Sequence, residues 1–392
     1  MSAPIEIRAY VVGFGDCILL KLPDGDQTRH VLIDFGRAPN DAASLERFPA
    51  IANDIAKQCS GHLDLVVVTH EHLDHLEGFY RQRAIFDQMQ VDQVWMGLPS
   101  RPDYYTKYRA ARPQKKLQEA VARFALTAAR QHLVLHPSYR SLLENNLANR
   151  DRIDYLRRLG KKPAVYLARG KVGVAASRFS RNIKIHVLAP EEDTSVYYGN
   201  TGSSRARVAA LSVTHGLSAS PAADESFAWD FKSVARAVEG AQEGFSASDF
   251  ERLRRAIRED GVAAARFIDR AQNNTSLCLL IEVAGKRLLL PGDAELESWD
   301  MMRKHCRAHL KPVDFLKVSH HGSHNGTPMD LLDQLLPVKR ASKAKVLVST
   351  KRNVYGTKLP VPDTGVLQEL GRRCSELLTT DGIQAMYVDV QV

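Results

Sequence analysis

Four potential metal ligands lie close together in one short segment, Thr69–His75. His70, His72, Asp74 and His75 follow directly after the apolar run LDLVVV. So many imidazole and carboxylate groups at a strand end lower stability through desolvation and repulsion unless a cation compensates them. The pattern therefore predicts a metal site. It nearly matches the HExxH helix of zinc proteases, but residue 74 is aspartate where the second histidine would fall, and a loop after a strand is the wrong context for that motif.

Two further groups of polar residues also follow apolar runs. Asp293 ends the sequence KRLLLPGD, and His320 and His321 lie in VDFLKVSHHGS. Together with the segment 69–75, these motifs resemble, in type and order, the HxHxDH signature, the bridging aspartate and the last ligand histidine of the metallo-β-lactamase fold superfamily. The resemblance implies an α/β fold, the four-layer αββα sandwich of that superfamily, with helical insertions.

Additional motifs narrow the resemblance. They are GFGD at 13–16, VLIDFG at 31–36, NNTSL at 273–277, LKVSHHGS at 316–323, VLVST at 346–350 and TTDG at 379–382. These motifs are similar to the metallohydrolase domain of ComEC-type DNA-uptake proteins. Most of 98–181 and 192–268 has no counterpart in the resemblance, and the membrane channel of competence proteins is not seen in the sequence. We therefore expect a stand-alone, soluble relative with its own insertions.

The resemblance implies two divalent metal ions, zinc or manganese. Its ligand set would be His70 and His72 for one ion, Asp74 and His75 for the other, Asp293 between them, and either His320 or His321 completing the second site. Two such ions about 3.5–4 Å apart can activate a shared hydroxide and stabilise both oxygens of an in-line phosphoryl displacement. The histidine of the pair that is not a ligand would be the general acid, because a histidine beside a metal site titrates near neutral pH. The candidate catalytic residues are thus Asp74, His320 and His321.

One position departs from the family pattern. Many members have a further histidine for the first metal just before the strand that leads to Gly-Asp, and this chain has Asn273 and Asn274 there. An amide oxygen such as that of Asn274 is a weaker and harder ligand than imidazole, so the first site is expected to be labile, to prefer manganese or magnesium, or to stay empty. His215 is an alternative ligand, although a lone histidine in a polar loop is more often solvated.

Other polar residues are expected to support the site. Asp34 would orient a ligand histidine, and Asp16 would do the same or cap the GFGD turn, with the turn favoured. Substrate binding or protonation of a leaving oxygen is expected from Asn273, Ser323, His324, Asn353 and Tyr355. Lys317 is expected to face outward from its strand. His132, His136 and His186 are interpreted as structural.

Strand-like segments must position these residues. They are expected at 5–12, 17–23, 30–36, 63–70, 183–190, 276–283, 286–293, 313–321, 344–350 and 385–392, with a helical pattern at 42–58. Two segments differ in character: a basic helical insertion at 99–181 and a low-complexity and helical insertion at 192–268. Because no clean linker interrupts the chain, we expect residues 1–392 to form a single elaborated domain.

The net charge of +9 is concentrated in one segment. Residues 101–180 hold 18 lysines and arginines against 5 acidic residues, a net charge of +13. Interleaved tyrosines suit a polyanion, because basic side chains can follow phosphates while aromatic rings stack on bases. Candidate nucleic-acid contacts are Lys107, Arg109, Arg112, Lys115 and Lys116. The alternative is a solvated face of an amphipathic helix, which the pattern of apolar residues at 117–128 also fits.

Composition sets broader limits. A chain of 392 residues with 44% hydrophobic residues can bury a sizeable core, which excludes a disordered or fibrous chain. No apolar run approaches the roughly 20 residues of a membrane-spanning helix, and the start MSAPIEIRAY is unlike a signal peptide. Five scattered cysteines are expected to be reduced, with Cys17 and Cys278 buried. We therefore expect a cytoplasmic protein.

Taken together, the motifs and the charge favour a metal-dependent hydrolase, a phosphodiesterase or nuclease that acts on DNA through metal-activated hydroxide. One alternative is a hydrolase of a small phosphorylated, ester or lactone substrate, because one fold supports many hydrolyses. The other is a metal-binding regulatory protein that depends on a protein partner, which the insertions could bind.

Overall fold

The strands expected from the sequence form two main sheets. The computed structural model describes residues 4–39, 41–112, 114–115, 144–145, 149–170, 182–198, 268–354 and 361–392. Much of both insertions, 99–181 and 192–268, lies outside these ranges. A short third pairing joins β4 (His62–Leu63) to β6 (Gln90–Val91).

The first sheet has seven strands. In spatial order they are β15 (Tyr387–Gln391), β1 (Glu6–Tyr10), β2 (Ile18–Asp24), β3 (Gln27–Ile33), β5 (Leu65–Val68), β7 (Val94–Gly97) and β8 (Val165–Leu167). Neighbours from β15 to β3 are antiparallel, and those from β3 to β8 are parallel. The parallel half places the ends of β3 and β5 side by side.

The second sheet has six strands. In spatial order they are β14 (Glu376–Thr379), β13 (Lys345–Val348), β12 (Phe315–Lys317), β11 (Lys286–Leu290), β10 (Cys278–Val283) and β9 (Ile183–Ala189). The strands from β14 to β11 are parallel, and β10 pairs antiparallel with β11 and β9. The ends of β11, β12 and β13 therefore lie at one edge of this sheet.

A shared apolar core joins the two sheets. Alternation along β2 directs Ile18, Leu20 and Leu22 into this core, where they belong to the same cluster as Leu279 and Leu288 of the second sheet. The side chain of Leu19, one position along, belongs to a different cluster on the opposite face. The two sheets thus pack face to face.

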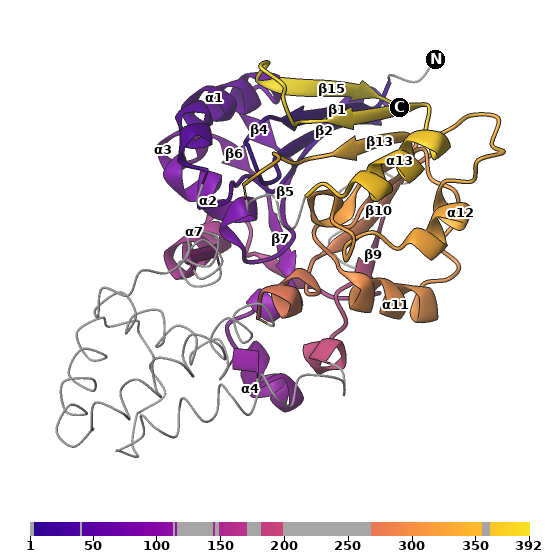
Figure 1. Ribbon diagram of the computed structural model, residues 1–392. Coiled ribbons are helices and arrows are strands. Elements are labelled where there is room, and N and C mark those ends of the chain that lie inside the picture. Colours follow the sequence, from indigo (N-terminus) through magenta and orange to yellow (C-terminus); the bar gives the residue numbers. More distant parts are fainter. Residues whose placement is uncertain are drawn as a thin grey trace, which may run out of the picture.

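Helices cover the other face of each sheet (Figure 1). Those packed on the first sheet are α1 (Phe48–Gln58), α2 (Leu73–Arg81), α3 (Arg83–Phe86) and α7 (Arg150–Leu159). Those packed on the second are α11 (Leu296–His305), α12 (Leu332–Leu335) and α13 (Thr364–Arg373). Shorter helical segments are α4 (Tyr104–Lys107) and the 3₁₀ turns η1 (Ala42–Arg47), η2 (Leu98–Ser100), η3 (Arg109–Ala111), η5 (Thr194–Tyr198), η6 (Ser319–Gly322) and η7 (Met329–Leu331). The structure confirms the predicted α/β class.

Most sequence expectations for the frame are confirmed. A strand overlaps each of the ten expected segments, and helical structure spans Ala42–Gln58. All five cysteines are free and buried, as expected of Cys17 and Cys278. Among the described residues, no helix is both long and apolar enough to cross a membrane.

Loops at strand ends bring the polar motifs together. Residues 69–72 follow β5, residues 291–293 follow β11 and residues 318–321 follow β12. Asp34 directly follows β3, and Ser349 directly follows β13. Both sheets therefore contribute to a single polar centre at their shared edge.

Candidate metal centre

Four buried side chains form the centre. Asp74 and His75 lie in the first turn of α2, Asp293 follows β11, and His321 lies in η6 after β12. Ligand-type atoms of all four lie within 4.8 Å of one another. His75 Nε2 and His321 Nε2 each lie 3.0 Å from Asp293 Oδ2, and His321 Nε2 lies 3.5 Å from Asp74 Oδ2. Their exposed fractions are 0–3%.

The donor set fits a divalent cation. Asp74 Oδ1 and His321 Nε2 are buried and have no hydrogen-bond partner of acceptable geometry. Buried polar atoms without partners are rare and costly, and a bound ion is one way in which proteins satisfy them. Two imidazoles and two carboxylates are suitable ligands for zinc or manganese. The buried His/Asp group could therefore hold a metal ion.

Neighbouring groups fix the orientation of both histidines of the buried group. His75 Nδ1 donates to Asp34 Oδ2 over 2.8 Å, and the Thr69 amide and hydroxyl donate to the same carboxylate over 2.8 and 2.7 Å. His321 Nδ1 donates to the carbonyl of Ser349 over 2.8 Å. With Nδ1 protonated in each ring, Nε2 is left as the atom that faces Asp293.

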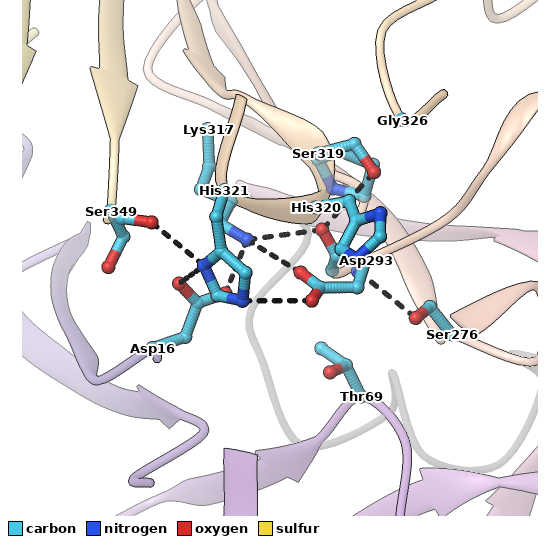
Figure 2. A network of polar contacts seen from close by, with 12 residues as sticks. Asp16, Thr69, Ser276, Asp293, Lys317, Ser319, His320, His321, Gly326 and Ser349 are labelled. Carbon is cyan, nitrogen blue, oxygen red and sulfur yellow. Dashed lines mark hydrogen bonds and ion pairs between the residues drawn. The ribbon is translucent and has the colours of Figure 1, made fainter. Parts of the chain in front are cut away.

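Lys317 lies inside the centre, so the expectation that it faces outward is wrong. Its side chain is 1% exposed. Figure 2 shows its ammonium group between Asp16 and Asp293: Nζ contacts Asp16 Oδ2 and lies 3.2 Å from Asp293 Oδ1 and 3.1 Å from the carbonyl of Gly292. The Asp16 carboxylate thus pairs with a buried lysine, which differs from the turn-capping role that the sequence favours.

The carboxylates and the cationic groups shift each other's pKa. Burial alone would lower the pKa of His75, but Asp293, Asp34 and Asp74 together raise it well above its usual value. Burial likewise opposes protonation of His321, yet its carboxylate neighbours, Asp293 first, raise its pKa to about 10. In return, despite burial, the nearby cationic groups lower the pKa of Asp74 to about 2 and that of Asp293 well below its usual value. Without a metal, protonated His75 and His321 supply the positive charge that balances the buried carboxylates.

His70 and His72 lie beside the four-residue group rather than in it. His70 Nε2 is 2.9 Å from His72 Nδ1, and the His70 and His75 ring centroids are 4.2 Å apart. His72 Nε2 is 3.7 Å from a carboxylate oxygen of Asp269. Burial lowers the pKa of His70 well below its usual value, and its histidine neighbours lower it further. His70 is therefore a neutral imidazole.

The two asparagines of the NNTSL motif have different surroundings. Asn274 Oδ1 accepts hydrogen bonds from the amides of Glu295 (3.2 Å) and Ser298 (2.9 Å) at the start of α11. This position resembles a helix cap contributed from a distant segment. Asn273 Nδ2 donates to Glu295 Oε1 over 2.8 Å and to His320 Nε2 over 3.3 Å. The Asn273 side chain therefore borders the centre through His320.

The two adjacent histidines of η6 are separated by the backbone. His320 and His321 have φ values of 46° and 55°, so both lie in the left-handed region. His321 points into the buried group, whereas the His320 side chain is 21% exposed and its Nδ1 lies 3.4 Å from Glu295 Oε1. Ser323 is buried, and its hydroxyl accepts from the amide of Gly326 over 3.2 Å.

The remaining expected residues lie outside the four-residue group or outside the described ranges. Asn353 has a φ of 63° in the turn after β13. Lys107, Arg109, Arg112 and Lys115 are exposed on and after α4. The Lys107 and Lys115 ammonium groups lie 5.6 Å from the ring centroid of Tyr108 and 5.9 Å from that of Tyr105, respectively. Lys116, Tyr355, His132, His136 and His215 fall outside the described residues.

Asn145 is a supporting residue that sequence patterns miss. Its Oδ1 accepts hydrogen bonds from the amides of Leu73 (2.8 Å) and Asp74 (3.4 Å), at the start of α2. The amide group of Asn149 also contacts the carbonyl of Glu71. These contacts tie part of the basic segment to the metal-ligand loop. They join residues more than 70 positions apart, so no local motif could reveal them.

Comparison with known proteins gives one partial similarity. A segment of 111 residues is 34% identical to ComE operon protein 3 of Bacillus subtilis (strain 168). It covers 28% of this chain and only 13% of that protein. No family model matches the chain. The similarity hints at a competence-related family and agrees with the motifs.

Proposed function

We propose that this protein is a metal-dependent phosphodiesterase that acts on DNA. The observation that carries the proposal is the buried group Asp74, His75, Asp293 and His321, which converges four ligand atoms and leaves two of them without hydrogen bonds. We assign the fold to the four-layer αββα sandwich, which agrees with the helices on the outer face of each sheet. The partial similarity to ComE operon protein 3 supports the resemblance to competence proteins.

These four residues would hold the tighter of two metal ions, zinc or manganese, and His70 with His72 would hold the weaker one. A cation bound there would polarise a phosphodiester oxygen and lower the pKa of water. Asp34 and the Ser349 carbonyl orient the two imidazoles in advance of binding. Lys317 Nζ contacts Asp293 Oδ1, so the other oxygen of that carboxylate, Oδ2, faces the histidines that would bind the metal.

His320 is the histidine left to carry a proton for the leaving oxygen. It borders the buried group and is partly exposed, and its Nδ1 lies 3.4 Å from Glu295 Oε1. The choice of DNA is supported by the exposed cations on and after α4. One pocket is lined by both Tyr105 of α4 and His70, and the Lys115 ammonium lies 5.9 Å from the centroid of the Tyr105 ring.

The test is cleavage of labelled single-stranded DNA, double-stranded DNA, RNA and a small aryl phosphodiester, with zinc, manganese, magnesium or a chelator. The Asp74→Asn variant removes a ligand charge at nearly constant shape. Asp26→Asn, in the exposed β2–β3 turn, is the matched control. We expect DNA cleavage by wild type and Asp26→Asn, and loss with chelator or Asp74→Asn.

Two outcomes would contradict the proposal. Cleavage of the small diester alone would indicate a small-molecule hydrolase, and inactivity of metal-loaded protein on every substrate would indicate a regulatory protein. Metal content is measured on the same samples so that an unloaded site is not mistaken for an inactive one.

A further inference from the structure

Helix α2 carries Asp74 and His75 in its first turn, directly after another candidate ligand, His72. The backbone of His72 is extended, with φ −80° and ψ 149°, as at the N-cap of a helix, but its side chain makes no capping hydrogen bond to the described part of α2. The ring lies against His70 instead, with Nδ1 2.9 Å from His70 Nε2. Short polar side chains such as asparagine and aspartate are the usual caps. A candidate ligand thus occupies the position from which a helix is normally capped.

Asn145, from the basic segment, supplies the cap. Its Oδ1 accepts from the amides of Leu73 over 2.8 Å and Asp74 over 3.4 Å. All three residues are 3–5% exposed, so water has little access to these amides. On the other side, the carbonyl of Asp74 accepts from the amide of Asp16 over 3.0 Å. Two segments distant in sequence therefore hold the backbone of Asp74.

The same part of the basic segment contacts the loop and α2 at two further points. Asn149, which is 5% exposed, donates from Nδ2 to the carbonyl of Asn145 over 3.0 Å and contacts the carbonyl of Glu71. Arg152 of α7 pairs with the buried carboxylate of Glu77 in α2. α7 packs along α2 (Figure 1). We refer to Asn145, Asn149 and Arg152 as the clamp.

We propose that the clamp positions Asp74 and His75 for metal binding, with Asn145 as its main positioning residue. This inference rests on the metal centre of the proposed function, but it does not depend on the substrate. Without the Asn145 acceptor, two buried amides lose their partner, and the first turn of α2 can satisfy them only by changing its backbone. Such a change moves the Asp74 carboxylate relative to His321 and Asp293. Groups that orient metal ligands typically change metal affinity by about 10–100-fold when they are removed.

A cap that served only the stability of the fold would behave differently. Its loss would lower the free energy of unfolding by the same amount with and without metal, because the affinity of the folded protein would not change. Loss of a positioning residue weakens metal binding to the folded protein, so it destabilises the metal-loaded protein more than the metal-free protein. Metal affinity therefore separates the two roles.

The first experiment titrates the full-length protein with Mn²⁺ in competition with a chelating dye. We expect Asn145→Ala to bind Mn²⁺ about tenfold or more weakly than wild type. Asn145→Asp keeps the acceptor and should bind at least as tightly as wild type. Asn53→Ala is the matched control, because the Asn53 side chain donates to the carbonyl of Pro49 on the exposed side of α1, and its affinity should not change. Folding of each variant is verified by circular dichroism.

Two results would overturn the proposal. One is an Asn145→Ala affinity equal to that of wild type, and the other is an equal loss in Asn145→Ala and Asn145→Asp, since the acceptor would then not be the cause. Asn149→Ala removes the contact that holds Asn145 and the Glu71 carbonyl, and it should weaken Mn²⁺ binding in the same direction by a smaller factor.

The second experiment compares urea unfolding of wild type and Asn145→Ala in chelator and in saturating Mn²⁺. The difference between the two proteins should be larger in Mn²⁺, and an equal difference in both conditions would overturn the positioning role.

DNA cleavage, measured on the same samples, separates this proposal from the proposed function. Metal binding that weakens in Asn145→Ala, without cleavage of any substrate by wild type, would support the clamp and contradict the phosphodiesterase. Cleavage by wild type with equal metal affinity in all variants would support the phosphodiesterase and overturn the clamp. Wild-type protein that binds no metal would overturn both.

Discussion

Removal of the buried ammonium group of Lys317 should destabilise the metal-free protein strongly. Lys317, Asp16 and Asp293 are each 1% exposed, and Nζ contacts carboxylate oxygens of both aspartates. Deleting one partner of a buried ion pair costs about 3–5 kcal/mol, because the remaining charge is buried without compensation. Lys317→Met keeps most of the side-chain volume, so this electrostatic cost should dominate.

Urea unfolding in chelator at pH 7 measures the effect. We expect the free energy of unfolding to fall by about 3–5 kcal/mol for Lys317→Met. Lys286→Met in the neighbouring strand β11 is the control: its side chain is 39% exposed and lies 3.9 Å from Asp314, so it should cost less than about 1 kcal/mol. The double variant Asp16→Asn/Lys317→Met removes both members of one pair and should be more stable than Lys317→Met by about 1 kcal/mol or more.

Metal titration supplies the second readout. With the ammonium group gone, the carboxylates of the centre attract a divalent cation without a competing positive charge. The affinity of Lys317→Met for manganese should therefore rise about tenfold or more, and added metal should restore much of the lost stability. A loss no greater than that of Lys286→Met, together with unchanged metal affinity, would refute the charge-balancing role of Lys317.

Three further predictions concern protons, the loop and the basic segment. Metal affinity should rise with pH up to about pH 10, because the raised pKa of His321 means that binding of a metal displaces a proton. Calorimetry at pH 7.5 in buffers of different ionisation enthalpy should detect the released proton. Metal binding without proton release would contradict this prediction. In chelator, protonated His321 stabilises the fold fully below its unfolded pKa of about 6.5, and this contribution should disappear by about pH 10 in unfolding experiments. Asn145→Ala should cost about 0.5–2 kcal/mol of unfolding free energy, as loss of a helix cap does, whereas Asn53→Ala on α1 should cost less. Arg109→Gln/Arg112→Gln should reduce the slope of log affinity for single-stranded DNA against log salt by about 1.4, measured by fluorescence anisotropy, and an unchanged slope would exclude both as phosphate contacts.

The frame was predictable because apolar runs determine it. Most expected strands contain a run of buried aliphatic residues, such as the LVVV of β5, and a local sequence pattern reveals such runs. The polar motifs at the ends of these strands could also be identified from the sequence. Several imidazoles and carboxylates buried in one segment lower stability, so such a segment indicates a functional site. β6, β7, β8 and β14 were missed: β6 has only two residues, β8 and β14 have partly exposed residues, and β7, VWMG, is a mixed run that ends in glycine.

The sequence does not predict which charged and polar side chains contact one another inside the centre. Lys317 lies in an apolar strand, FLK, where strand alternation alone leaves its direction open. Its partners Asp16 and Asp293 are distant in sequence, and only the packing of the two sheets brings them together. The same reason explains Asn145, which lies 72 positions from the residue of α2 that it caps. The side chains of His320 and His321 diverge because both residues adopt left-handed backbone angles, which sequence spacing alone does not reveal.

The charge balance of the centre would allow one structure to serve both the metal-free protein and the proposed metal-bound protein. Four carboxylates are buried there, from Asp16, Asp34, Asp74 and Asp293, and Lys317 compensates one of them. Without a metal, the raised pKa values of His75 and His321 keep two protons in the centre. A divalent cation that displaces these two protons leaves the net charge unchanged. The side chains are already in place, so binding of a metal would exchange one compensating charge for another instead of driving the chain to fold.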